Sequence, residues 1–225
     1  MIRILIHCGV LALFFGRTTV MGQRGPLVDS FIRKVPAACN TVLGSKLVVM
    51  PYHVPKWYVP WACSYEQWQL FSGYPNRKMI TLFGQLLAFE GDTSLCGKEV
   101  CRYGYTDSKK PFTKTYTVQI DALYQLAILA VGGYAGYYCP YPVLVDTVTG
   151  KEVNDDPVAV REVFAVYRKW LLDNTKKKFK NFGVPLRTSR YRWYGIRESK
   201  MWLLSDTFRI GQLGGSFTKV GVCLD

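Results

Sequence analysis

An uncharged stretch of 24 residues, 122–145, constrains the fold of this chain more than any other feature. A helix that crosses a bilayer needs about 20 mostly apolar residues, and Pro140 would end such a helix near Cys139. The stretch therefore predicts one transmembrane helix over about residues 120–139. The alternative is a buried helix of a soluble domain, preceded by a strand over residues 115–121, where apolar and polar residues alternate.

Small and aromatic residues within the stretch suit the membrane interpretation. Gly132 and Gly136 stand four residues apart, with Gly133 between them, so one helix face would let another helix approach closely. Aromatic rings with a polar tip favour the headgroup level of a bilayer. Three tyrosines at the end of the stretch are predicted to lie there: Tyr134, Tyr137 and Tyr138.

Residues 49–75 are rich in prolines and aromatic residues. The prolines exclude a long helix up to Pro60, and Trp57, Tyr58 and Trp61 are predicted to lie along a membrane interface or across a partner protein. The alternative is a loop that packs these rings onto its own core. The apolar run over residues 79–89 is too short to span a bilayer and predicts a buried helix or strand.

The chain is strongly basic, with 29 Lys and Arg against 16 Asp and Glu and a net charge of +13. Such a charge implies acidic partners, namely nucleic acid, anionic lipid or acidic protein surfaces. Residues 157–181 predict a long amphipathic helix, which Asp156 would cap and which Pro157 would begin. Its basic end, and the alternation of Arg with aromatic residues over residues 187–200, predict contacts with such a partner. The candidate residues are Lys176, Lys177, Lys178, Lys180, Arg187, Arg190, Arg192 and Arg197.

The first 35 residues predict a targeting or anchoring segment. Arg3 precedes an apolar run over residues 4–16, and no acidic residue occurs before Asp29. This pattern fits a secretory signal, a mitochondrial presequence or a short membrane anchor, and the basic, acid-free start is the feature that supports a mitochondrial location.

The sequence offers little material for catalysis. Its two histidines and seven cysteines form no catalytic triad and no metal-binding motif. Its acidic residues form no paired-carboxylate motif. Cys96 and Cys101 would close a small disulfide loop in an oxidising compartment, or remain free thiols in a reducing one. We therefore expect no enzyme activity, no catalytic or metal-binding residue and no cofactor.

Together these features predict a mainly α membrane protein. Its four parts would be an anchor segment (1–35), an aromatic and proline-rich region (36–114), a transmembrane helix (115–145) and a basic C-terminal part (146–225). The function that we expect is that of a non-catalytic accessory subunit in a mitochondrial inner-membrane complex, the respiratory chain or ATP synthase. Its partners would be other subunits and an anionic lipid such as cardiolipin. The alternative is a basic RNA-binding subunit of an organellar ribosome or another ribonucleoprotein.

Overall fold

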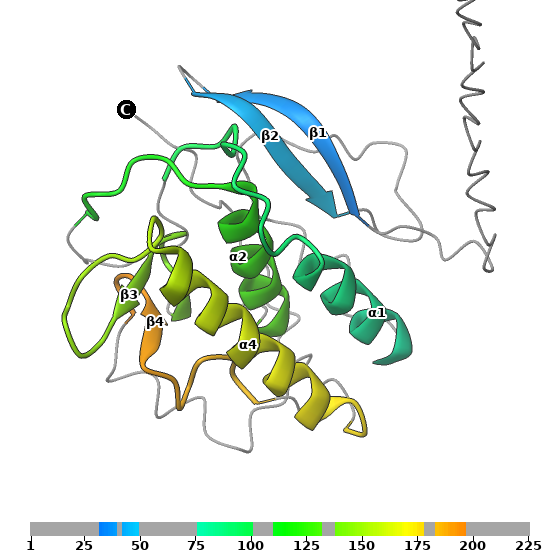
Figure 1. Ribbon diagram of the computed structural model, residues 1–225. Helices are drawn as coiled ribbons and strands as arrows, with labels where there is room; N and C mark the ends of the chain where they lie inside the picture. Colours follow the sequence, from blue (N-terminus) through cyan, green and yellow to red (C-terminus); the bar gives the residue numbers. More distant parts are fainter. Residues whose placement is uncertain are drawn as a thin grey trace, which may run out of the picture.

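The fold combines helices with small antiparallel sheets. The computed structural model describes residues 32–39, 42–49, 76–100, 110–131, 138–177 and 183–196. Within these ranges it has three helices and two two-stranded antiparallel sheets (Figure 1). The elements are β1 (Ile32–Cys39), β2 (Val42–Val49), α1 (Asn76–Leu87), α2 (Val118–Val131), β3 (Leu144–Asp146), α4 (Pro157–Asn174) and β4 (Tyr191–Trp193). The prediction of a mainly α protein is therefore wrong. The predicted division into four parts stays a prediction.

Helix α2 stands where the transmembrane helix was predicted. It has 14 residues, all of them buried, and it packs against α1, β2 and the Trp193 ring of β4. Among the described residues no helix has both the length and the apolar character that a bilayer span requires. The prediction of a transmembrane helix is wrong, because an apolar surface on every side of a helix can be covered by protein as well as by lipid. The inner-membrane assignment thereby loses the observation that carried it.

Backbone contacts explain why α2 begins at Val118. The N–H groups of Val118 and Gln119, which have no partner inside the helix, donate to the carbonyl oxygens of Ser94 and Asp92 at 2.9 and 3.0 Å. The alternating pattern over residues 115–121 therefore leads into a helix, and only Thr117 forms a β-bridge, with Leu95.

The β1–β2 hairpin is extended by a third segment of the chain. The two strands pair along their full lengths, with Ile32 opposite Val49. On the other side of β2, the Ser45 N–H donates to the Leu95 carbonyl at 3.0 Å. A Cβ atom at Gly44 would stand 2.3 Å from that carbonyl oxygen, so only glycine permits the two backbones to approach this closely.

Helix α4 begins where its sequence predicts. The Asp156 side chain accepts hydrogen bonds from the backbone N–H groups of Val158 and Ala159 at 2.9 and 3.1 Å, and Pro157 occupies the first helical position. The helix ends at Asn174, before the predicted end at residue 181. Residues 178–182 lie outside the described part of the chain.

Helices α1 and α4 pack side by side and run in opposite directions (Figure 1). The Phe83 and Trp170 rings meet with their centroids 5.6 Å apart, and Arg168 of α4 forms an ion pair with Glu90, which follows α1. On the other side of α4, the short β3–β4 sheet brings Trp193 into the core, where its indole N–H donates to the Tyr167 hydroxyl at 3.1 Å. The two helices therefore place the first turn of α1 beside the last turn of α4.

Candidate functional site

The buried thiols do not supply a nucleophile. Cys96 and Cys139 are free and buried. Burial, together with the nearby Asp121 carboxylate, raises the pKa of Cys96 to about 12, and burial raises the pKa of Cys139 well above its ordinary value. These thiols stay protonated near neutral pH, where the thiolate is the reactive form. In the described part of the chain no group of three or more His, Cys, Asp or Glu side chains could hold a metal ion.

A buried ion pair lies beside Cys96. The Lys98 ammonium donates to both Asp121 oxygens, at 3.0 and 3.3 Å, and Asp121 also accepts from the Leu47 N–H and the Gln125 amide. The Gln125 amide donates in addition to the Leu47 carbonyl at 2.9 Å. The carboxylate is completely buried and has several donors of its own, so we assign it the structural role of joining α2 to β2 and to the Lys98 segment.

Lys46 lies half-buried near this pair. Desolvation, followed by the neighbouring Lys98 charge, lowers the pKa of its amine. A lowered amine pKa is a feature of catalytic lysines, but here no second reactive group accompanies it, because Cys96 is protonated and Asp121 is engaged with Lys98. This cluster therefore does not provide a nucleophile with a matching base.

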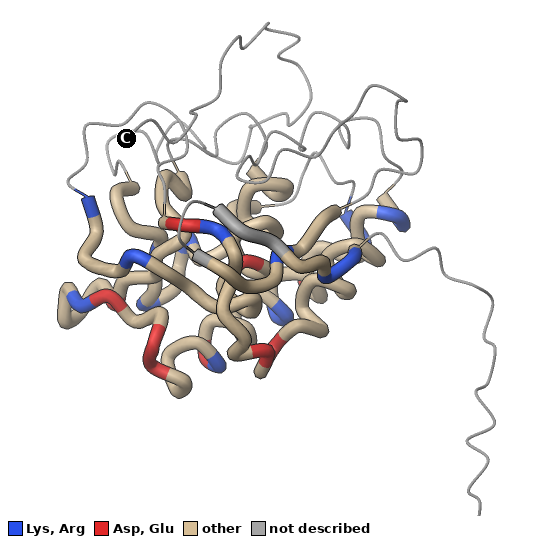
Figure 2. The backbone as a smooth tube through the Cα atoms, turned by 90° about the horizontal axis from the view of Figure 1, so that it is seen from above, with Lys and Arg blue, Asp and Glu red and all other residues tan. Residues whose placement is uncertain are grey.

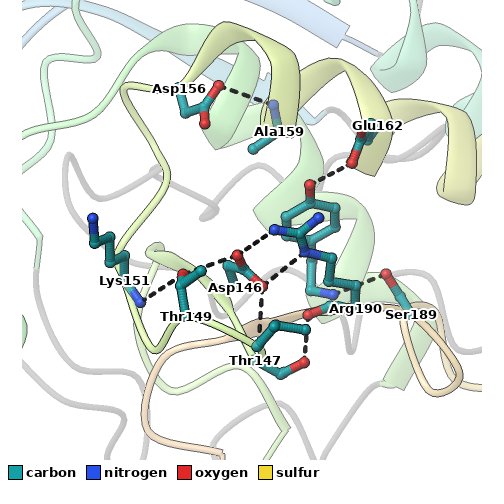
Figure 3. A network of polar contacts seen from close by, with 11 residues as sticks. Asp146, Thr147, Thr149, Lys151, Asp156, Ala159, Glu162, Ser189 and Arg190 are labelled. Carbon is teal, nitrogen blue, oxygen red and sulfur yellow. Dashed lines mark hydrogen bonds and ion pairs between the residues drawn. The ribbon is translucent and has the colours of Figure 1, made fainter.

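A second network centres on Asp146 at the end of β3 (Figure 3). Arg190 donates from Nε to Oδ1 at 2.9 Å and from a terminal nitrogen to Oδ2 at 2.6 Å, while the Val148 N–H and the Thr149 hydroxyl donate at 3.0 and 2.9 Å. The hydrogen bonds from Arg190 hold the pKa of Asp146 well below its ordinary value. Arg190, predicted as a partner contact, is thus already bonded inside the fold, although its side chain remains 53% exposed.

The carboxylates of the described residues are mostly engaged within the fold. They form ion pairs, accept backbone hydrogen bonds or cap a helix, and the residues concerned are Glu90, Asp92, Asp121, Asp146, Glu152, Asp156, Glu162 and Asp173. Lys and Arg residues, by contrast, occur on several sides of the described backbone (Figure 2). Net charge alone therefore does not locate a site.

Four cations gather where the first turn of α1 meets the last turn of α4, and we call this surface the basic end. Its members are Arg77, Lys78, Lys176 and Lys177. The Asn76 side chain donates to the Lys177 backbone carbonyl and so joins two segments that lie a hundred residues apart in sequence. Arg77, Lys176 and Lys177 are exposed, and none of them forms an ion pair with another described residue.

The start of α1 makes the basic end electrostatically unusual. A helix N-terminus carries partial positive charge and is stabilised by acidic side chains. The first turn of α1 has no acidic residue and holds Arg77 and Lys78 instead. Basic side chains in place of the preferred acidic ones at this end of a helix favour a negatively charged partner.

A second exposed feature is the loop over residues 110–114, which we call the Phe112 loop. Glu152 accepts hydrogen bonds from the backbone N–H groups of Phe112 and Thr113, at 2.8 and 2.7 Å, and from the Thr113 hydroxyl at 2.6 Å. The loop holds the Phe112 ring 89% exposed between exposed Lys110 and Lys114. Phe112 was not predicted from the sequence, although it stands between two lysines much as the aromatic residues of 187–200 stand between arginines.

The structure places the predicted site residues in different surroundings. Lys176 and Lys177 lie in the basic end, Arg187 is exposed, Arg192 is half-buried, and Tyr138 is buried in the core. Several others lie outside the described residues: Trp57, Tyr58, Trp61, Gly132, Gly133, Tyr134, Gly136, Tyr137, Lys178, Lys180 and Arg197.

No family model matches the chain, and no curated protein or solved structure matches it either.

Proposed function

We propose that this chain is a non-catalytic, RNA-binding accessory subunit of a ribonucleoprotein assembly. The observation that supports it best is the basic end, where Arg77, Lys176 and Lys177 are exposed and unpaired among the described residues. A phosphate backbone supplies closely spaced negative charge that such a cluster would neutralise, with release of bound counterions.

RNA fits these features better than an anionic lipid does. Lipid binding by a basic helix needs an apolar face that can enter the bilayer. The apolar face of α4 is occupied by the core, in which Val163, Phe164 and Tyr167 are completely buried. The helix can therefore offer its basic end to a polyanion without offering its apolar side chains to a membrane.

Three further predictions from the sequence concern catalysis, cellular location and a membrane complex. The absence of catalysis is part of the proposal, and the measurements below do not depend on it. A mitochondrial location stays a prediction from the first 35 residues, which lie almost entirely outside the described part of the chain. The inner-membrane complex is not proposed here, because its support was the transmembrane helix that the fold replaces with α2.

Salt-dependent binding tests the proposal. The full chain is titrated into a fluorescein-labelled 20-nucleotide single-stranded RNA at several KCl concentrations, and fluorescence anisotropy gives Kd. We expect log Kd to rise linearly with log salt concentration, by about 0.7 for each phosphate neutralised. The variant Lys176→Gln/Lys177→Gln is expected to lower this slope by about 1.4.

A charge-matched control separates a site from a general effect of net charge. The variant Arg33→Gln/Arg161→Gln also removes two exposed positive charges, one on β1 and one in the first half of α4. At a rise of 1.5 Å per residue, Arg161 lies about 20 Å along the helix from its basic end. We expect its slope to stay near that of the natural chain. Equal slopes for the two double variants, or no binding at 50 mM KCl, would contradict the proposal.

A further inference from the structure

The Phe112 loop is unusual because an apolar ring is held outside the fold by a charged clamp. Phe112 is 89% exposed, which is the highest exposure of any large hydrophobic side chain in the described residues. Burial of such a ring against a partner would remove a large apolar area from water. The ring therefore has no role in the described core, and its position calls for an explanation outside it.

The clamp limits the freedom of the loop backbone. Glu152 uses both carboxylate oxygens, one toward the Phe112 N–H and one toward the N–H and hydroxyl of Thr113. The Glu152 backbone is itself held by an antiparallel β-bridge to Val145 of β3, the residue before Asp146. A ring presented by a backbone that is already ordered loses less conformational entropy when a partner binds.

Two cations and one carboxylate surround the ring. Lys110 and Lys114 stand two residues before and two residues after Phe112, and both are exposed. The Glu152 carboxylate is engaged by the backbone of the loop. The two exposed cations leave a net positive charge beside the apolar face of the ring.

The loop also meets the second basic and aromatic segment of the chain. The Tyr194 hydroxyl donates to the Lys110 carbonyl at 3.3 Å, and the Tyr194 ring packs edge to face against Tyr141 with centroids 5.9 Å apart. The fold thus brings residues 110–114 beside Tyr194, which follows β4 and lies 84 positions away from Lys110 in sequence.

We propose that Phe112 stacks on an unpaired base of single-stranded RNA, while Lys110 and Lys114 contact the phosphates on either side of that base. This inference rests on the proposed function and adds the form of RNA that is bound. Stacking on aromatic side chains between basic residues is how proteins hold single strands without reading their sequence. The exposed lysines on both sides of the ring favour a polyanion over an apolar protein surface as the partner that covers it.

The test compares Phe112→Ala with Val148→Ala in the full chain. Val148 is also an exposed apolar residue, 77% exposed, on the turn that follows β3, so it is a matched control. Anisotropy is measured with a 20-nucleotide oligouridine and with a 20-base-pair RNA duplex. We expect Phe112→Ala to weaken oligouridine binding about 5- to 150-fold without changing the salt slope, and to leave duplex binding unchanged.

A double-mutant cycle tests the clamp as a positioning device. Glu152→Gln replaces one accepting oxygen with an amide and is expected to weaken oligouridine binding severalfold. In the Phe112→Ala background the same change should have no further effect, because the ring that Glu152 positions is gone. Thermal unfolding of each variant would show whether an affinity loss comes from loss of the fold.

The outcomes separate this inference from the proposed function. If the full chain binds neither RNA, both fail. If it binds oligouridine with a salt-dependent Kd and Phe112→Ala binds as tightly as Val148→Ala, only the stacking proposal fails. Equal weakening toward oligouridine and duplex would also overturn it, because paired bases offer no free face to the ring.

Discussion

Two ion pairs with a buried aspartate, Lys98–Asp121 and Arg190–Asp146, differ in how much water reaches the cation. In the Lys98–Asp121 pair both side chains are buried, with 5% and 0% exposure. In the Arg190–Asp146 pair the carboxylate is buried, but the guanidinium is 53% exposed. Water can replace the partner of Arg190 when that pair is broken, whereas a buried charge that loses its partner stays uncompensated. The two pairs should therefore differ greatly in their contribution to stability.

The two pairs also indicate which cations are available to contact a partner. Asp121 and Lys98 are inaccessible, and Asp146 holds Arg190 against the turn that follows β3 (Figure 3). Cations that are bound in this way contribute less to the capture of a partner than cations with no internal partner. The basic end, with Arg77, Lys176 and Lys177, is thus a better candidate surface than Arg190, although all of these residues are basic.

The largest effect is expected for Lys98→Met, which leaves the Asp121 charge buried without its cation. We expect the free energy of unfolding to fall by about 3–5 kcal/mol in urea denaturation. The double variant Lys98→Met/Asp121→Leu removes both charges and should recover part of that loss. A loss below about 1 kcal/mol for the single variant would mean that the pair is not the buried clamp described here.

Arg190→Gln should have a smaller effect that depends on pH. The pKa of Asp146 is lowered from its ordinary value of 3.8, chiefly by Arg190, so the folded carboxyl binds protons less readily than the unfolded one. Its contribution to stability is present above pH 3.8 and disappears as the pH falls toward the lowered pKa. The natural chain should therefore lose more stability than Arg190→Gln between pH 5 and pH 2. Parallel curves of Tm against pH would contradict this.

A third carboxylate, Asp156, extends the comparison to a residue that has helix N–H groups as its donors. Asp156→Ala removes the two hydrogen bonds to Val158 and Ala159 at the start of α4. We expect a loss of about 1 kcal/mol in the free energy of unfolding, measured in urea. Asp156→Asn retains an accepting oxygen and should lose less. Equal losses for the two variants would show that the charge matters more than the cap.

The smallest effect on stability is expected at the basic end. Lys176→Gln/Lys177→Gln removes exposed side chains that form no ion pair with a described residue. We expect a change within about 0.5 kcal/mol in the free energy of unfolding. The same variant should show the reduced salt slope in RNA binding. A clear loss of stability would mean that these lysines serve the fold rather than a partner.

Features set by neighbouring residues were predicted from the sequence better than features set by distant parts of the chain. The Asp156 cap and Pro157 fix the start of α4 because the relevant donors lie within three residues. The stretch over residues 122–145 was misassigned, because an uncharged run has the same composition whether lipid or protein covers it, and the elements that cover α2 come from distant parts of the chain. The β1–β2 hairpin was not foreseen either, since Pro36 interrupts the first strand and weakens its pattern.

The candidate site shows the same limit. Lys176 and Lys177 could be selected from the sequence, but Arg77 and Lys78 join them only because α1 runs antiparallel to α4. The Phe112 loop depends on Glu152, which lies 40 residues farther along the chain and shares no motif with the loop. Contacts of this kind follow from tertiary packing, which spacing along the sequence does not record.

Sedimentation before and after ribonuclease treatment shows whether the chain belongs to a ribonucleoprotein particle. A mildly prepared lysate of the cells that make this protein is divided in two, one half is digested, and both are run on glycerol gradients and probed for the chain. We expect the chain to sediment with a large particle and to move to the slow fractions after digestion. Fast sedimentation that ribonuclease leaves unchanged, or slow sedimentation before digestion, would contradict the assignment to a ribonucleoprotein.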